Sequence, residues 1–396
     1  MAKLNIQKYP CNFILFYAIS FMPPAIFNSF FPVYLSNKGY NQTDIGTLLA
    51  IGPLIILVAQ PLWGITSDRA RYKNDILFII TMGTALSVLL YNFSASFSYL
   101  IAVTVIFTTF YSGIIPIGDT IILESLERTQ FSFGPIRMAG TIGYAVMAII
   151  AGFIAQKNIN SIFFLYAIIV AVSLIFTIRM PKVKGYLKQA KEKVSIMSLF
   201  RDKKLVIFLI FNLIISITFC FYSNFFPLYY IQSGADNVLL GLATFICSMS
   251  EIPFLIFADR ILKKIGTHNA LIGSAIVSVL RWILLFFITN PYINLAMQML
   301  HGLTFIVFNY SMVTYINKES PKEFKATAQV IYTLTVMGIA RALSGVLGGY
   351  LSNRFGIRQI FLLNTFVTII AIVLFVSAFI ALCGKRKEHV QNGVNQ

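Results

Sequence analysis

The chain has 396 residues, of which 58% are hydrophobic and 11% are charged, and its mean hydropathy is +0.79. Soluble globular domains carry about 25% charged residues, so the composition excludes a soluble domain. The net charge of +17 would suit nucleic-acid binding if it were clustered, but the basic residues follow a different pattern along the chain.

Twelve apolar stretches are long enough to cross a membrane as helices, for which about 18 residues suffice. The first has no small-residue cleavage site and is too long for a signal peptide, so we interpret it as the first span. In chain order, we expect spans at residues 12–36, 43–64, 75–95, 98–124, 136–156, 160–179, 204–233, 237–258, 268–288, 291–317, 326–351 and 357–383. The chain is therefore predicted to be an all-α membrane protein with twelve transmembrane helices.

Basic residues are distributed unevenly between the two sets of connecting loops. With both termini cytoplasmic, only Lys38, Lys157, Arg354 and Arg358 of the 31 Lys and Arg lie in external loops. This asymmetry follows the positive-inside rule and predicts that both termini are cytoplasmic. We expect a multi-pass protein of the plasma membrane, in bacteria the cytoplasmic membrane, with lipid around it and no nucleic-acid partner.

The longest polar stretch, residues 179–204, divides the chain near its midpoint and leaves six spans on either side. Paired repeats of this kind are typical of secondary transporters, whose substrate site lies near the membrane midplane between the halves. We expect four parts: an N-terminal half (1–180), a cytoplasmic central loop (181–203), a C-terminal half (204–384) and a cytoplasmic tail (385–396).

A short motif follows the second span and returns, altered, after the eighth. Residues 64–73 read GITSDRARYK and fit the pattern G-x-x-x-D-R-x-x-x-[RK]. In the second copy, Leu255 replaces the glycine. The pattern resembles the signature of the major facilitator superfamily, which implies two pseudo-symmetric six-helix halves. The residues that we expect to form a conformational latch on the cytoplasmic face are Gly64, Asp68, Arg69, Lys73, Asp259 and Arg260.

Gly64 would allow close helix packing in this latch, and Asp68 would pair with nearby basic groups.

Ionisable residues within spans cost several kcal/mol unless they are paired or hydrated, so they are candidates for function. Asp119 and Arg137 each lie nine residues from Arg128, in the loop between spans four and five. Because the two spans are antiparallel, we expect these side chains at the same depth, where they can form a charge-assisted pair. The pair could bind a solute, or it could be a salt bridge that joins two helices.

A second set of charges comes from the C-terminal half. Arg281 and His301 lie ten residues on either side of one loop centre, and His301 and Arg341 lie twenty on either side of the next. Glu251 falls at a similar depth. We therefore expect these four side chains in one layer near mid-membrane, as a proton-coupling site. The alternative is a buried network that only fixes helix packing.

The tenth span also carries a polar face. Gln298 and His301 are separated by three residues, and Phe305 and Asn309 continue the same side of the helix. We expect this face to line a polar cavity, with Gln298 and Asn309 among the substrate-binding residues.

A closer resemblance is to the lactose permease and phenylpropionate permease groups of this superfamily. It is carried by FGPIRMAGTIGY at 133–144, by FFP at 30–32 and by QPL at 60–62. Glu251, LRW at 280–282 and QMLHGLTF at 298–305 are similar to the phenylpropionate group. The resemblance covers nearly the whole chain except the tail. It implies that Asp119 and Arg137 bind solute and that Tyr144 stacks against it.

Two departures from the lactose permease group affect proton coupling. Thr304 stands where that group has a proton-carrying glutamate, and the seventh span has no carboxylate. Glu251 and His301 remain as proton carriers, with Arg281 as the charge that tunes them. We favour Glu251, because a site that holds two arginines keeps a histidine neutral.

The function that these features predict is uptake of a small solute, a sugar or a small organic or aromatic acid, by proton symport. A proton-coupled efflux antiporter is the first alternative, although 138–152 lacks the Gly-Pro motif typical of that class. A membrane-embedded transferase is the second, although no HExxH, GxSxG or GK[ST] motif is present. We expect no enzymatic activity, no cofactor and no metal, and a monomer suffices for the mechanism.

Overall fold

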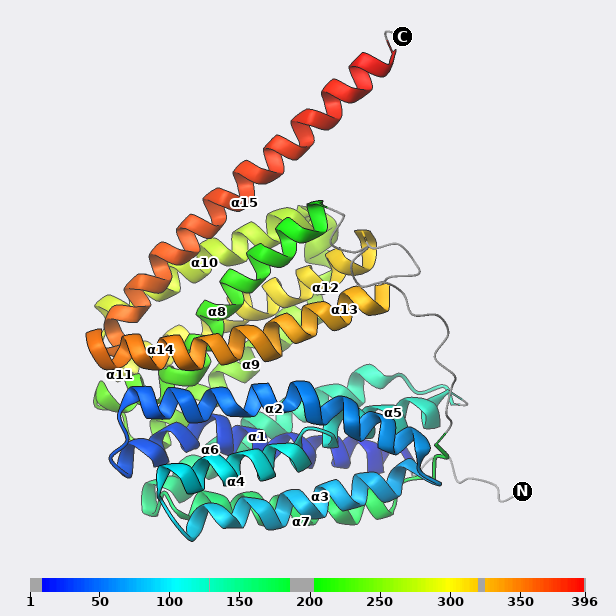
Figure 1. The fold of residues 1–396 in the computed structure, drawn as a ribbon, viewed down its shortest axis with the longest axis vertical. Helices are drawn as coiled ribbons and strands as arrows, with labels where there is room; N and C mark the ends of the chain where they lie inside the picture. Colours follow the sequence, from blue (N-terminus) through cyan, green and yellow to red (C-terminus); the bar gives the residue numbers. More distant parts are fainter. Residues whose placement is uncertain (1–8, 128, 186–202, 320–324, 395–396) are drawn as a thin grey trace.

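A computed structural model describes residues 9–127, 129–185, 203–319 and 325–394, which form helices joined by short turns, with no β-strand among them (Figure 1). The N-terminal helices are α1 (Tyr9–Asn37), α2 (Gln42–Arg69), α3 (Lys73–Leu89), η1 (Leu90–Asn92), α4 (Phe97–Tyr111), α5 (Ile114–Leu126), α6 (Phe133–Lys157) and α7 (Ser161–Ile178). The C-terminal helices are α8 (Lys203–Gln232), α9 (Asn237–Ile265), α10 (Thr267–Phe287), α11 (Pro291–Met297), η3 (Gln298–Leu300), η4 (Gly302–Ile306), α12 (Val307–Glu319), α13 (Lys325–Thr333), η5 (Leu334–Ala340), α14 (Arg341–Phe355) and α15 (Ile357–Val394).

The twelve predicted spans are confirmed. Within the described residues, twelve helical stretches are long and apolar enough to cross a membrane, from Cys11–Asn37 to Ile357–Ala381. Some spans combine several elements, since α4 and α5 together form Phe97–Leu126. Large apolar side chains such as Val58 and Phe153 are exposed on the outside of the bundle, where lipid tails would cover them.

Two helices run further than expected. α2 continues to Arg69 and α9 to Ile265, so the Asp-Arg pairs of both motif copies lie on the last helical turns rather than in loops, while Lys73 begins α3. Basic residues at these ends, Lys263 and Lys264 in α9, stabilise the negative end of the helix dipole. Most of the expected central loop, residues 186–202, lies outside the described residues, and α15 continues through most of the expected tail.

The two six-span halves lie side by side, with α1 to α7 in one layer and α8 to α15 in the other (Figure 1). Small residues bring them into backbone contact at one end. A Cβ added to Gly46 of α2 would lie 2.2 Å from the Gly345 carbonyl oxygen of α14. A Cβ added to Gly241 of α9 would lie 2.5 Å from the Ala148 carbonyl oxygen of α6. Only glycine permits such close packing of membrane helices.

This closed end carries the turns after α1 and α6, which the loop charges predict to be external. Hydrogen bonds between the halves support the contact: the Asn237 backbone N–H donates to Gln156 Oε1 over 3.0 Å. Deeper in the membrane, Ser29 and Thr244 are joined through their hydroxyls over 3.1 Å. With cytoplasmic termini, the structure is therefore an arrangement closed to the outside, and its cavities lie between the halves further in.

Candidate functional site

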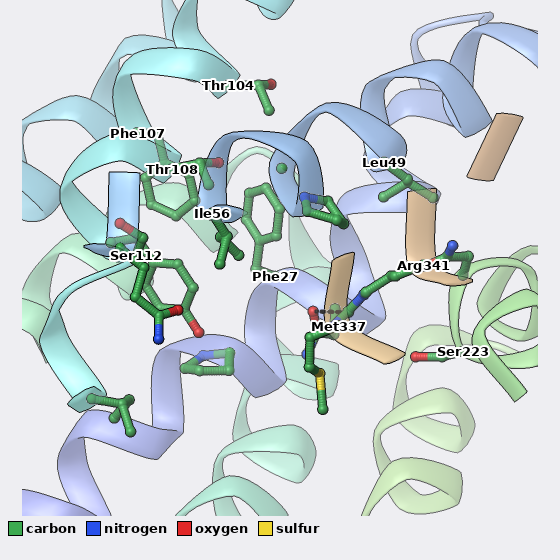
Figure 2. A pocket seen from close by; sticks show the side chains of 18 of the residues that line it. Phe27, Leu49, Ile56, Thr104, Phe107, Thr108, Ser112, Ser223, Met337 and Arg341 are labelled. Carbon is green, nitrogen blue, oxygen red and sulfur yellow. Dashed lines mark hydrogen bonds between the residues drawn. The ribbon is translucent and has the colours of Figure 1, made fainter. Parts of the chain in front are cut away.

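Two cavities lie between the halves, on either side of α1. One has a volume of about 330 Å³, and we call it the aromatic cavity because Phe27, Phe107, Tyr111 and Tyr166 line it (Figure 2). The other has a volume of about 320 Å³, and we call it the charged cavity. The charged cavity is lined by the ionisable residues Arg137, Glu251, His301 and Arg341, among others. Asn28, Ser223 and Arg341 line both cavities.

On the C-terminal side of the charged cavity, α9 meets the distorted tenth span. His301 Nε2 lies 3.2 Å from Glu251 Oε1. Gly302 makes this approach possible, since a Cβ there would lie 2.1 Å from the Ser250 carbonyl oxygen. The Gly302 backbone N–H also donates to Ser250 Oγ over 3.0 Å. The two helices are thus held close enough for the acid and the imidazole to meet.

Arg281 of α10 stands behind the histidine and is fully buried. Its Nη1 donates to His301 Nδ1 over 3.0 Å, and its Nη2 donates to Gln298 Oε1 over 2.9 Å. The guanidinium carbon lies 4.2 Å from the ring centroid of Tyr222, whose hydroxyl also donates to Gln298 Oε1. Gln298 Nε2 in turn donates to the Asn294 carbonyl oxygen over 2.9 Å. A polar network therefore surrounds the buried cation.

The donor directions give one consistent hydrogen-bond pattern for this network. Arginine is a donor only, so His301 Nδ1 must accept from Arg281. The imidazole proton is then on Nε2, which lies 3.2 Å from Glu251 Oε1. A doubly protonated His301 would place an N–H against the arginine N–H. His301 thus lies between the two, accepting from the arginine through Nδ1 and facing the glutamate through Nε2.

On the N-terminal side, a tyrosine stands between the predicted partners. The Tyr17 hydroxyl of α1 donates to Asp119 Oδ1. The Arg137 guanidinium lies 4.2 Å from the Phe21 ring centroid and 5.8 Å from that of Tyr17. The ion pairs of the described residues do not include Asp119 with Arg137 within 4.0 Å. The direct pair expected from equal depth is not formed in this structure.

Glycines of α6 allow α1 to pack closely enough to place the Tyr17 ring beside Asp119 and Arg137. A Cβ added to Gly143 would lie 2.1 Å from the Ala18 carbonyl oxygen, and one added to Gly140 would lie 2.9 Å from Phe21 Cδ2. Because α1 packs directly on α6, its aromatic side chains reach into the space between α5 and α6. Tyr144 follows on the same helix and lines the charged cavity with Arg137.

The other predicted residues divide into lining and supporting positions. Arg281 and Gln298 are fully buried behind the lining residues. Asp119 and Asn309 line neither cavity. Asn309 Oδ1 accepts from the Tyr332 hydroxyl, and its Nδ2 donates to the Phe305 carbonyl oxygen over 2.9 Å. In this structure Asn309 joins two helices rather than facing a solute.

Arg341 lies on the same cavity as Glu251 and His301, but its hydrogen bond is to the other half. Its Nη2 donates to Asn28 Oδ1 of α1 over 3.2 Å (Figure 2). Sequence reasoning did not single out Asn28, which has no charge and no motif. It also missed the π-helical turns η4 and η5, which directly follow His301 and directly precede Arg341. Such turns occur frequently at functional sites.

The residues expected to form the latch have partners within their own half. Lys73 Nζ lies 3.3 Å from Asp68 Oδ1 and 2.7 Å from Glu124 Oε1, and the lysine is 5% exposed. Glu124 was not predicted from the sequence. A Cβ added to Gly64 would meet no atom within 4 Å, so the close packing expected of that glycine is not found in this arrangement.

In the second copy of the motif, Asp259 Oδ1 accepts from the Tyr310 hydroxyl over 2.6 Å. The Arg260 guanidinium lies 5.8 Å from the Phe257 ring centroid, and Arg69, in the first copy, is exposed. Among the side chains that the structure describes, no group of three or more His, Cys, Asp or Glu could hold a metal ion.

Comparisons with known proteins agree with this arrangement. The model of the MFS_1 like family matches residues 10–363. "Uncharacterized transporter YwbF" of Bacillus subtilis (strain 168) is 28% identical over 370 residues, which cover 92% of each chain. "Maltose permease" of Geobacillus stearothermophilus is 24% identical and covers 91% of this chain and 92% of its own. The crystal structure of the nucleoside transporter NupG has the same fold, with a TM-score of 0.84, 17% identity and coverage of 95% of this chain and 99% of its own.

The resemblance drawn from the motifs is confirmed by two further relatives. "Lactose permease" of Citrobacter freundii and "Probable 3-phenylpropionic acid transporter" of Escherichia coli (strain K12) are each 23% identical to this chain. They match 84% and 86% of it, and 85% and 90% of their own lengths.

Proposed function

The chain belongs to the MFS_1 like family and is a secondary transporter of the major facilitator type, and we propose that it takes up a small organic solute by proton symport. The main support for this proposal is the Glu251–His301–Arg281 network, which lies beside a cavity between the two halves. A titratable carboxylate at this position is accessible from the same space as the solute.

Glu251 is the proposed proton carrier. In the structure its Oε1 lies 3.2 Å from His301 Nε2, at the end of a chain of contacts that begins at Arg281. Protonation removes the negative charge that the His301 N–H contacts and weakens the link between α9 and the tenth span. The proton can thereby change the relative stability of the two arrangements of the halves, which is what coupling requires.

Arg137 and Tyr144 are the proposed solute contacts on the N-terminal side, since both line the charged cavity. In this proposal Asp119 acts through Tyr17. The Tyr17 hydroxyl donates a hydrogen bond to Asp119, and the Tyr17 ring faces Arg137. Gln298 and Arg281 hold His301 from behind, and Asn309 is withdrawn from direct solute contact. Relatives named as sugar and aromatic-acid transporters support both solute classes.

The alternating step is proposed to be a rocking of the halves about these cavities. The glycine contacts of α2 with α14 and of α6 with α9 would separate, and the motif-bearing ends would approach. Asp68, Lys73 and Glu124 would act in this exchange as the latch. Both termini would be cytoplasmic, as the loop charges indicate.

The test is uptake into vesicles that contain the purified full-length protein. We expect radiolabelled maltose or 3-phenylpropionate to accumulate above its external concentration when the outside is more acidic, and a protonophore should abolish the accumulation. Uptake that ignores the proton gradient would contradict symport. Accumulation only when the gradient is reversed would identify the efflux antiporter instead.

A further inference from the structure

Of the described mid-membrane arginines 137, 281 and 341, Arg341 is the one that lines both cavities. It begins α14 directly after the π-helical turn η5, and Figure 2 shows its side chain at the aromatic cavity. It donates to the neutral Asn28, and no Asp or Glu of the described residues lies within 4.0 Å of it. The facing helix α8 contributes Ser223 and Asn224 there and has no acidic residue in its sequence.

The charges of this layer do not balance. Among the described mid-membrane side chains, arginines 137, 281 and 341 stand against Asp119 and Glu251. Both acids already have partners, Asp119 the Tyr17 hydroxyl and Glu251 the His301 imidazole. An uncompensated charge in a membrane is costly, and the cost grows when the glutamate takes up a proton. A bound anion beside Arg341 would offset it.

The aromatic cavity begins where Arg341 and Asn28 meet. Its rings contact one another: the Phe107 centroid lies 5.1 Å from that of Phe27, 5.8 Å from that of Tyr111 and 5.4 Å from that of Tyr166. A volume of about 330 Å³ is at the lower end of the range for small-molecule sites. The cavity therefore has room for one ring with a short side chain.

Three of the polar side chains that line the aromatic cavity already donate hydrogen bonds within the protein. Thr104 Oγ1 donates to the Leu100 carbonyl oxygen over 2.7 Å, and Ser112 Oγ donates to the Thr109 carbonyl oxygen over 2.9 Å. Asn224 Nδ2 donates to Ser344 Oγ over 3.0 Å. A sugar would bring many hydroxyls that need partners, and unmatched polar groups are costly to bury. An aromatic ring needs none.

We propose that the substrate is an organic monocarboxylate with an aromatic ring, which binds across both cavities. Its carboxylate binds the Arg341 guanidinium in place of Asn28, and its ring enters the aromatic cavity. This deepens the proposed function and rests on it. Since the Arg341–Asn28 bond joins α14 to α1, its replacement by the carboxylate also loosens a contact between the halves.

Symport of one such anion with one proton moves no net charge across the membrane. The carboxylate carries one negative charge and the proton on Glu251 carries one positive charge. A neutral sugar with one proton would instead move one positive charge. The response of uptake to a membrane potential therefore distinguishes the two substrate classes.

The binding test compares 3-phenylpropionate with its uncharged amide and with maltose, by calorimetry on purified full-length protein. We expect the acid to bind about tenfold to a hundredfold more tightly than the amide, the range for a hydrogen bond to a charged group. Arg341→Gln should reduce this preference to within threefold. Arg354→Gln, which changes an exposed arginine of the same helix, should retain it.

Asn28→Asp is the second variant, because it keeps the shape and hydrogen bond of residue 28 while giving Arg341 a permanent anion. It should weaken binding of the acid about tenfold or more and leave the weak binding of the amide within threefold. Equal affinity of the wild type for acid and amide, no binding of the acid, or an unchanged preference in Arg341→Gln would overturn the proposal.

The transport test uses the same protein in vesicles. An inward proton gradient should drive uptake of 3-phenylpropionate, whereas a negative-inside potassium diffusion potential with valinomycin should change it less than twofold. Proton-driven uptake of maltose but not of the acid would overturn this inference and leave symport standing. If neither solute responds to the proton gradient, symport itself fails, while the calorimetric preference still tests binding at Arg341.

Discussion

The two halves hold their charged side chains in different ways. In the C-terminal half, Arg281, His301 and Glu251 form a continuous chain of contacts, and the arginine is completely enclosed. In the N-terminal half, Asp119 and Arg137 are separated by Tyr17, and the arginine is exposed to the cavity. One half offers an enclosed path of polar contacts that ends in a carboxylate, and the other offers an open cation among aromatic rings.

This difference shows what equal depth in the membrane can and cannot determine. Counting residues from a loop gives the height of a side chain along its helix, but not its direction around the helix axis. In the C-terminal half, the π-helical turn that begins at Gly302 brings His301 toward both partners. In the N-terminal half, α1 packs closely on α6 and places a ring between the acid and the base.

The largest effect should come from the enclosed network. Glu251→Gln mimics the protonated acid and cannot release a proton, so accumulation of solute above its external concentration should be lost. Exchange of labelled solute between preloaded vesicles and medium should continue, because it needs no net proton movement. The measurement is uptake and exchange in proteoliposomes with an imposed pH gradient.

Glu124→Gln is the matched control for that experiment, because Glu124 pairs with the latch lysine outside the network. It should slow uptake but keep its final level. If Glu251→Gln still concentrates solute, the proton is carried elsewhere, and the contrast between the halves loses its functional meaning.

For the N-terminal half, we predict that exchanging the charges of Asp119 and Arg137 does not restore solute binding. Arg137→Asp should weaken solute binding about tenfold or more, since it removes a charged contact. Exchanging the charges, with Asp119→Arg in the same chain, should not restore affinity, because the wild-type side chains do not pair directly. Calorimetric titration of both variants checks this, and restored affinity in the double variant would show a structural ion pair instead.

A glycine comparison tests how the enclosed network is positioned. Gly302→Ala would place a Cβ 2.1 Å from the Ser250 carbonyl oxygen, so α9 must move away from His301. We expect a loss of about 1–3 kcal/mol in stability, typical of overpacking, together with weaker coupling. Gly64→Ala is the control, since its Cβ would contact nothing within 4 Å. Thermal unfolding in detergent compares them, and equal melting temperatures would contradict the prediction.

Much of the fold was predictable because the membrane imposes simple rules. Span length, loop charge and the midpoint division depend only on local composition, so the twelve spans were found within a few residues. The ends of α2 and α9 were not, since charged residues can continue a helix beyond the hydrocarbon layer.

The site was predictable only where charge marked it. Glu251, Arg281 and His301 stand out as costly groups in an apolar chain, and the structure brings them together. Tyr17 and Asn28 give no such signal, because one tyrosine among nineteen and a single asparagine look like ordinary packing residues. Their roles follow from which helices pack side by side, which is a long-range property of the fold.

The smallest effect should come from the latch, whose residues Asp68, Lys73 and Glu124 line neither cavity. Asp68→Asn removes one partner of the buried Lys73, but Glu124 remains 2.7 Å from its Nζ. The lysine therefore stays paired, and the rate of exchange between arrangements should fall only a few-fold. Equilibrium binding of the solute should stay within threefold of the wild type, because no binding residue has changed.

The double variant with Glu124→Gln leaves a buried lysine without an acidic partner and should lower both the rate and the melting temperature much further. Calorimetry measures the solute affinity of the two variants, and stopped-flow measurements give their rates of exchange between arrangements. A large loss of affinity in Asp68→Asn at a normal exchange rate would place this end of α2 in solute binding rather than in switching.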